Sequence, residues 1–165
     1  LASTDGPFEH GDHAAAARFA QFDALLADLQ REGITPVVIL TPLAGRVLAA
    51  MKDMGQAFGY LAEVRAYLAG LEVESYDFLD PAALGADDCE FVDGFHGGEV
   101  VYQRILLAIV ERNPASALAP LLDATALRAA AASPGYALAP ESARDYSATE
   151  ADFLELGCPK PARGS

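Results

Sequence analysis

The chain has 165 residues, a hydrophobic content of 52% and a formal net charge of −13 at pH 7. This length suits one domain, and the apolar content excludes an intrinsically disordered chain. Lys and Arg supply most of the affinity for phosphate, so the negative charge excludes a nucleic-acid partner. No run approaches the roughly 18 consecutive apolar residues of a membrane helix, and we expect no transmembrane segment in these residues.

The first half of the chain predicts two helices that alternate with two strands. Apolar residues at helical spacing indicate a helix over 12–31, which Gly33 ends. The β-branched run 34–40 predicts a strand that is buried on both faces of a parallel sheet. A long second helix is predicted over 45–68, and a second strand over 73–78.

The second half begins with an acidic loop over 81–99 and continues with a helix over 98–112. Its composition then shifts to Ala and Pro, with one more predicted helix over 118–132. The capping-box spacing at 147–150 predicts a final short helix around Phe153.

This order of elements predicts an α/β fold in which parallel strands are joined by a crossover helix. We expect the α/β portion to cover residues 1–113. Residues 114–165 are expected to form an Ala/Pro-rich helical extension and tail.

Nine acidic residues stand between positions 72 and 99 with no Lys or Arg among them. Such a run is typical of a solvated loop surface. The nine residues are Glu72, Glu74, Asp77, Asp80, Asp87, Asp88, Glu90, Asp93 and Glu99.

Asp93 and His96 lie in this loop, after a predicted strand and before a predicted helix, which is where open parallel sheets place their sites. A carboxylate three residues before a His, on a turn eased by Gly94, can accept the proton of one ring nitrogen. The other nitrogen is then able to act as a general base. Asp-x-x-His also occurs by chance, and the alternative is a loop His beside an N-cap acid.

The succession of strand, Thr41-Pro42, long helix, second strand, acidic loop and Asp93-x-x-His96 resembles the C-terminal half of SGNH (GDSL-like) hydrolases, and among them the cell-envelope acyltransferases of the D-alanyl-lipoteichoic-acid type. The resemblance covers residues 12–112. It implies a flavodoxin-like, three-layer α/β/α domain with a parallel sheet. It also implies a serine esterase or O-acyltransferase in which His96 is the general base and Asp93 orients it.

The family's Gly-Asp-Ser and Asn blocks have no counterpart here, because no serine stands in such a setting and Asn113 is the only Asn. We therefore expect the chain to be the C-terminal portion of a longer protein whose missing N-terminal part carries the nucleophile. The resemblance implies no cofactor, a small-molecule or carbohydrate ester as substrate, and a periplasmic or cell-envelope location.

Three further residues are candidates for substrate binding. Arg46 follows the first predicted strand, where it would meet an anionic group, although a surface Arg is the ordinary alternative. Gly97 and Gly98 are expected to leave room for a substrate beside the imidazole of His96.

His10 and His13 are weak candidates for a metal site, because two His residues three apart with flanking carboxylates suit a transition metal. We expect no metal, since Gly11 breaks any helix between them and Asp12 suits a helix N-cap. Cys89 and Cys158 are expected to be reduced; a single bridge between them, typical of exported proteins, is the alternative.

A second function from a different class is also open. The chain would then be a non-catalytic acidic α/β domain that binds a partner, a degenerate or truncated member of the family. Asp93 and His96 would be incidental to that function.

Overall fold

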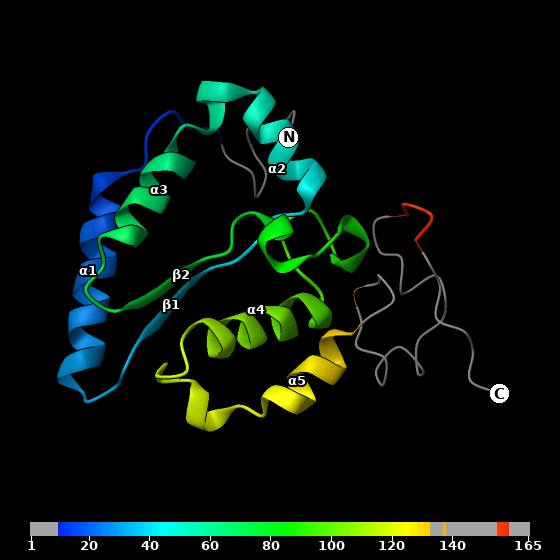
Figure 1. Ribbon diagram of the computed structural model, residues 1–165. Coiled ribbons are helices and arrows are strands. Elements are labelled where there is room, and N and C mark those ends of the chain that lie inside the picture. Colours follow the sequence, from blue (N-terminus) through cyan, green and yellow to red (C-terminus); the bar gives the residue numbers. More distant parts are fainter. Residues whose placement is uncertain (1–9, 133–136, 138–154, 159–165) are drawn as a thin grey trace. The chain divides into compact units, whose positions relative to one another are not determined.

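The computed structural model describes residues 10–132, 137 and 155–158 (Figure 1). The chain forms two compact units, one of Leu1–Leu40 with Ala49–Asp77 and the other of Thr41–Leu48 with Phe78–Ser165. It passes from the first unit to the second directly after each of its two strands. Residues on both sides of position 113, where the sequence predicts a boundary, belong to the second unit.

The first unit is built on two parallel strands with helices before and between them. Helix α1 (Ala16–Arg31) precedes β1 (Val37–Leu40), and α3 (Tyr60–Ala69) precedes β2 (Glu74–Asp77). The strands pair in parallel, in register over all four residues of each. The α/β class and the parallel pairing are therefore confirmed, within a small two-stranded sheet.

The expectation that the first strand is buried on both faces is wrong. Each residue of β1 is only half-buried, and within the described sheet β1 has a single neighbouring strand, β2. Phe19 of α1 stacks on Tyr67 of α3, with ring centroids 4.3 Å apart. Among the described residues of this unit, the buried apolar side chains include Leu26, Met51, Phe58 and Leu68.

The single helix predicted over 45–68 is also wrong, because two glycines interrupt it. Helix α2 (Gly45–Asp53) ends before Gly55, which adopts the left-handed conformation at φ +56°. A short 3-10 helix (Gly55–Phe58) follows, and α3 begins after Gly59. A Cβ at Gly59 would lie 2.6 Å from the carbonyl oxygen of Asp12, so only glycine fits this approach.

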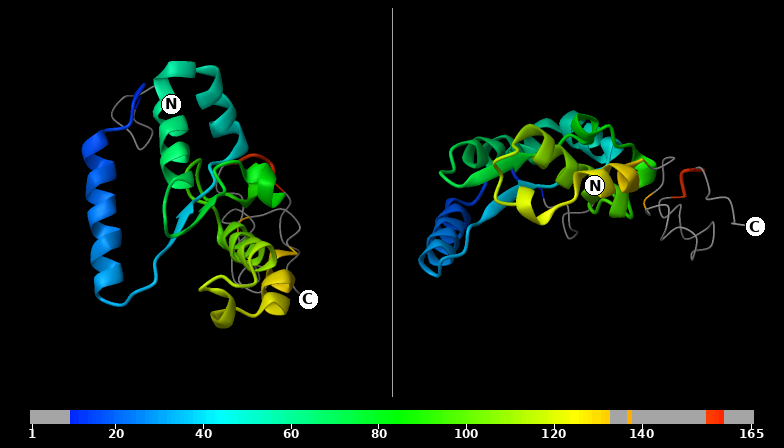
Figure 2. Two further views of the ribbon diagram at one scale, coloured as in Figure 1. Left: turned by 60° about the vertical axis from the view of Figure 1, so that its left-hand side comes forward. Right: turned by 60° about the horizontal axis from the view of Figure 1, so that its bottom comes forward.

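The second unit contains α4 (Glu99–Arg112) and α5 (Ala124–Ala131), which lie side by side (Figure 2). The helix predicted over 118–132 is shorter than expected, because Asp123 caps α5 and a 3-10 turn (Ala119–Leu121) that contains a proline precedes it. The core of this unit consists of apolar side chains from the loop and the helices: Phe78, Phe91, Val100, Val101, Ile105, Ile109 and Leu127.

The predicted acidic loop is more ordered than its composition indicates. It contains two 3-10 helices, Pro81–Leu84 and Asp88–Glu90, each capped by the carboxylate of the Asp that precedes it. The helix predicted near Phe153 lies outside the described residues. Among the described helices, none combines the length and the apolar character that crossing a membrane requires.

Candidate active site

Residues 91–97 form a tight hairpin in the second unit, between the 3-10 helix Asp88–Glu90 and α4. Phe91 makes an antiparallel bridge with Gly97, and the Val92 N–H donates to the His96 carbonyl at 2.9 Å. The Phe91 side chain is 1% exposed. The base of the hairpin is therefore anchored in the core of the unit.

Asp93 uses both carboxylate oxygens inside this hairpin. Its Oδ1 accepts the backbone N–H groups of Phe95 at 2.7 Å and of His96 at 2.6 Å. Its Oδ2 lies 2.8 Å from Nδ1 of His96. One carboxylate thus closes the turn and orients the imidazole, a double role that the spacing of three residues allows.

Two opposing effects act on the pKa of the Asp93 carboxyl. Partial burial alone would raise this pKa, but the hydrogen bonds from the His96 ring and from the backbone of His96 and Phe95 outweigh it. The net result is a pKa below the usual value, because these hydrogen bonds favour the charged form. Asp93 is therefore ionised at neutral pH.

The ionised carboxylate of Asp93 determines which ring nitrogen of His96 carries the proton. A carboxylate can only accept, so Nδ1 carries the proton and Nε2 is the nitrogen able to take one. The His96 side chain is 62% exposed. The imidazole is thus both oriented and accessible, which are two requirements of a general base.

Gly97 and Gly98, which were expected to leave room for a substrate beside the imidazole, are positions where the structure has no space for a side chain. A Cβ at Gly97 would lie 2.7 Å from Cγ1 of Val101, and one at Gly98 would lie 2.3 Å from the carbonyl oxygen of Ala137. The chain's own atoms occupy this space. Both glycines are therefore required for the close packing of the hairpin against Val101 of α4 and against Ala137, which follows α5.

Arg46 is held by a carboxylate of the acidic loop. Its Nε donates to Oδ2 of Asp88 at 3.0 Å, and its backbone N–H donates to Oδ1 at 3.2 Å. The Arg46 side chain remains largely exposed. The ion pair connects the start of α2 to the loop that carries the hairpin.

Glu90 and Arg104 form a buried ion pair that the sequence analysis missed. Glu90 is 1% exposed, and its Oε1 accepts from the Arg104 guanidinium at 2.6 Å. Burial raises the pKa of Glu90 to about 7, although the nearby Arg104 charge opposes this rise. The only available signal in the sequence was the capping-box spacing of Asp87 and Glu90.

The acidic run is therefore not simply a solvated surface. Besides Asp88 and Glu90, Asp77 also has a cationic partner, because its carboxylate accepts from Nε of Arg65. The composition of the run gave no indication of these ion pairs, since their arginines lie elsewhere in the chain.

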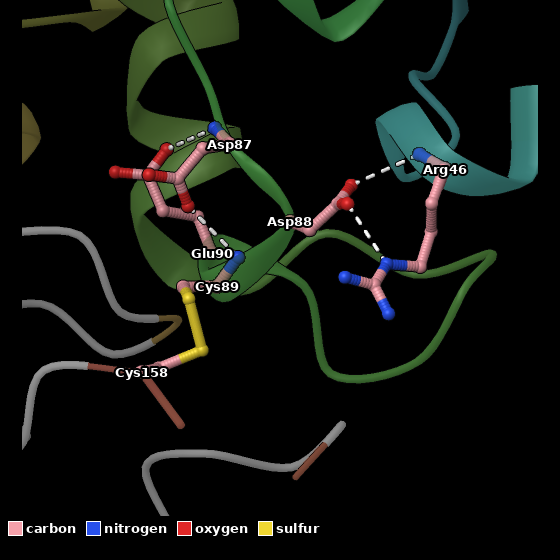
Figure 3. The surroundings of a disulfide bond; sticks show 6 residues. All are labelled: Arg46, Asp87, Asp88, Cys89, Glu90 and Cys158. Carbon is pink, nitrogen blue, oxygen red and sulfur yellow. Dashed lines mark hydrogen bonds and ion pairs between the residues drawn. A yellow bond between two sulfur atoms is a disulfide. The ribbon is translucent and has the colours of Figure 1, made fainter. Parts of the chain in front are cut away.

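Cys89 and Cys158 form a disulfide bond, which corrects the expectation of two reduced cysteines (Figure 3). The bond links the loop before the hairpin to a segment 69 residues further along the chain. Asp88, Cys89 and Glu90 are consecutive, and each side chain is joined to a different part of the second unit. Two ion pairs and a disulfide bond thus fix the loop before the hairpin to the rest of the second unit.

The histidines proposed as weak metal ligands have separate partners in the first unit. The His10 ring packs edge-on against Phe58 at 5.0 Å, while Nδ1 of His13 lies 2.6 Å from Oε1 of Glu63. Within the described residues, no group of three or more His, Cys, Asp or Glu side chains could hold a metal ion.

Neither of the two described serines is presented as a nucleophile. The Ser75 hydroxyl donates to the Leu68 carbonyl in the first unit. Ser116 is buried, and its oxygen accepts the N–H of Leu118. The described part of the chain thus offers an oriented base without an adjacent nucleophile.

No family model, curated protein or solved structure matches this chain. A functional assignment therefore depends on the geometry of the hairpin and on the chemistry of its side chains.

Proposed function

We propose that the chain supplies the Asp–His part of a serine esterase or O-acyltransferase that resembles the SGNH hydrolases. The observation that carries this proposal is the 2.8 Å contact between Oδ2 of Asp93 and Nδ1 of an exposed His96. The proposed fold of the whole enzyme is the three-layer α/β/α domain of that superfamily. Its nucleophilic serine would come from a part of the protein outside these 165 residues.

In the proposed reaction, Nε2 of His96 removes the proton of the serine hydroxyl while the serine oxygen attacks the ester carbonyl. Asp93 stabilises the imidazolium that forms. His96 then returns the proton to the leaving alkoxide, and an acyl-serine remains. Water completes an esterase cycle, whereas an acceptor hydroxyl completes an acyl transfer, and neither route requires a cofactor.

Two properties of the chain support this class of substrate and location. A net charge of −13 disfavours polyanions, which leaves small esters and acylated carbohydrates as the proposed substrates. The Cys89–Cys158 disulfide suits an oxidising compartment such as the periplasm or the cell envelope.

Hydrolysis of p-nitrophenyl acetate by the full natural protein tests the proposal. We expect His96→Ala to lower kcat/KM by about 10²–10⁴-fold, because a positioned general base contributes about that much. His13→Ala is the matched control, since His13 also pairs with a carboxylate, and it should retain full activity. Equal activity of the two variants would refute the role of His96.

One observation favours the second candidate function, a non-catalytic domain that binds a basic partner. Val92 and Phe95 of the hairpin are 39% and 42% exposed, and the Phe95 ring packs edge-on against His96. Exposed apolar side chains among acids would suit a cationic protein surface. Under this function Phe95→Ala would weaken binding to a cationic protein, and the unsubstituted protein would not hydrolyse p-nitrophenyl acetate.

A further inference from the structure

We propose that Glu90 and Arg104 are positioning residues for His96: their buried ion pair fixes the base of the hairpin to α4 and thereby the orientation of the imidazole. The proposal deepens the proposed function, and its catalytic consequence depends on that function. The orientation of the imidazole can be measured independently of any activity.

Arg104 joins α4 to both 3-10 helices of the acidic loop. Its guanidinium donates to the carbonyl groups of Leu84 and Gly85, at the end of the first 3-10 helix, and to Oε1 of Glu90 in the second. The side chains of Arg104 and Glu90 are both largely withdrawn from solvent. Water therefore cannot readily replace either partner when the other is lost.

The backbone of Glu90 connects this ion pair to the hairpin. Its carbonyl accepts the Gly98 N–H at 2.8 Å, so Glu90 and Gly98 form the pair directly outside the Phe91–Gly97 bridge. The ladder continues to the hydrogen bond between Val92 and His96. An unbroken series of contacts thus leads from Arg104 to the residue that carries the imidazole.

The other contacts that hold this loop are not both buried and adjacent to the hydrogen-bonded ladder of the hairpin. The Arg46–Asp88 pair is more exposed, and the Cys89–Cys158 bond joins the loop to residue 158 rather than to a residue of α4. Among the ion pairs and the disulfide of this loop, the Glu90–Arg104 pair is the one that is buried and adjoins the hairpin ladder. The N–H of the buried Ala44 also donates to the Gly94 carbonyl of the hairpin, at 3.1 Å. Reduction of the disulfide should consequently leave the imidazole oriented.

The test is the tautomer of His96, read from the ring ¹⁵N signals of the full natural protein labelled in its histidines. We expect a single tautomer with the proton on Nδ1 in the unsubstituted protein. Glu90→Gln and Arg104→Gln should give a mixture of tautomers, whereas Arg104→Lys should restore most of the parent signal. Arg128→Gln, which breaks the exposed Arg128–Glu111 pair, is the matched control and should change nothing.

A folded Glu90→Gln variant that keeps the parent tautomer would overturn the proposal. If the variants do not fold, amide hydrogen exchange in the unsubstituted protein decides. The N–H groups of Val92 and Gly98 should then be as protected as that of Ile109 in α4. Exchange of the hairpin amides more than 100-fold faster than Ile109 would show that α4 does not hold the hairpin.

The catalytic consequence is measured separately. Glu90→Gln should lower kcat for p-nitrophenyl acetate about 10-fold with KM unchanged, since it misplaces a general base without touching the substrate. A mixed tautomer in the variant, with no esterase activity in the parent, would refute the proposed function and leave the positioning role intact. Full activity of the Glu90→Gln variant with an unchanged tautomer would refute the positioning role and leave the proposed function intact.

Discussion

Each unit of the molecule contains one histidine whose Nδ1 contacts a carboxylate. In the first unit His13 lies 2.6 Å from Glu63, and in the second His96 lies 2.8 Å from Asp93. Each carboxylate also accepts backbone N–H groups, in the first unit that of Ala14. By distance and exposure alone the two pairs are hardly distinguishable.

The difference between the pairs lies in what holds them. Glu63 is 50 residues from His13 and connects α3 to the segment before α1. Asp93 and His96 share one hairpin whose base is closed by a bridge and by the buried Glu90. A short His–carboxylate distance therefore does not identify a catalytic pair, and the support around it is more informative.

The largest expected difference between the pairs is in activity. Asp93→Asn in the full natural protein should lower ester hydrolysis by about 10²–10⁴-fold, because the amide no longer holds the required tautomer. Glu63→Gln should leave hydrolysis unchanged. Initial rates with p-nitrophenyl acetate measure both, and equal losses would remove the distinction between the two pairs.

The buried Glu90–Arg104 ion pair, which supports the hairpin of the second pair, should contribute to the free energy of unfolding. Arg104→Met should lower the free energy of unfolding by about 3 kcal/mol at pH 8, because the buried Glu90 carboxyl would lose its charged partner. Arg128→Met, in the exposed pair with Glu111, should cost less than about 0.5 kcal/mol. Urea denaturation of both variants gives the comparison, and similar midpoints would contradict it.

The disulfide should contribute a similar amount to the free energy of unfolding. Replacing Cys89 and Cys158 by Ser should lower the free energy of unfolding by about 2–4 kcal/mol, since the bond closes a loop of 69 residues in the unfolded chain. The ring signals of His13 and His96 should both persist in the double variant. Loss of the single His96 tautomer would mean that the disulfide orients the hairpin.

The smallest expected effect is the pH dependence of the exposed His13–Glu63 pair in the first unit. The hydrogen bond to Glu63 raises the pKa of His13 above its usual 6.5, and the same bond lowers the pKa of Glu63 below 4.5. The stabilisation from His13 is therefore complete below pH 6.5 and is lost as the pH rises through the raised pKa. That from Glu63 is complete above pH 4.5 and is lost on acidification.

The pair should accordingly be strongest between about pH 4.5 and 6.5. The amide shift of Ala14, whose N–H donates to Glu63, should move when the pH is raised above 6.5. The Glu63→Gln variant is the control in which this movement should disappear. An unchanged shift in the unsubstituted protein would show that the contact does not depend on the charge of His13.

The sequence predicted most of the fold elements of the described residues. The alternation of helical and β-branched periodicity gave α1, α4 and the two parallel strands, although the strands proved shorter than expected. The continuous helix over 45–68 was wrong, because helical periodicity does not register a left-handed Gly55 or the close approach of Asp12 to Gly59. Of the candidate site, the sequence predicted only the pairing of Asp93 with His96, whose positions are three residues apart.

The sequence alone predicted the contact between Asp93 and His96, because a spacing of three residues and a glycine turn allow the carboxylate to reach the imidazole. The folded structure was needed to show that Glu90 is buried on Arg104 and that Cys89 is bonded to Cys158. These contacts join residues 14 to 69 positions apart. Burial and long-range pairing depend on the folded core, whereas a tight turn depends on a few neighbouring dihedral angles.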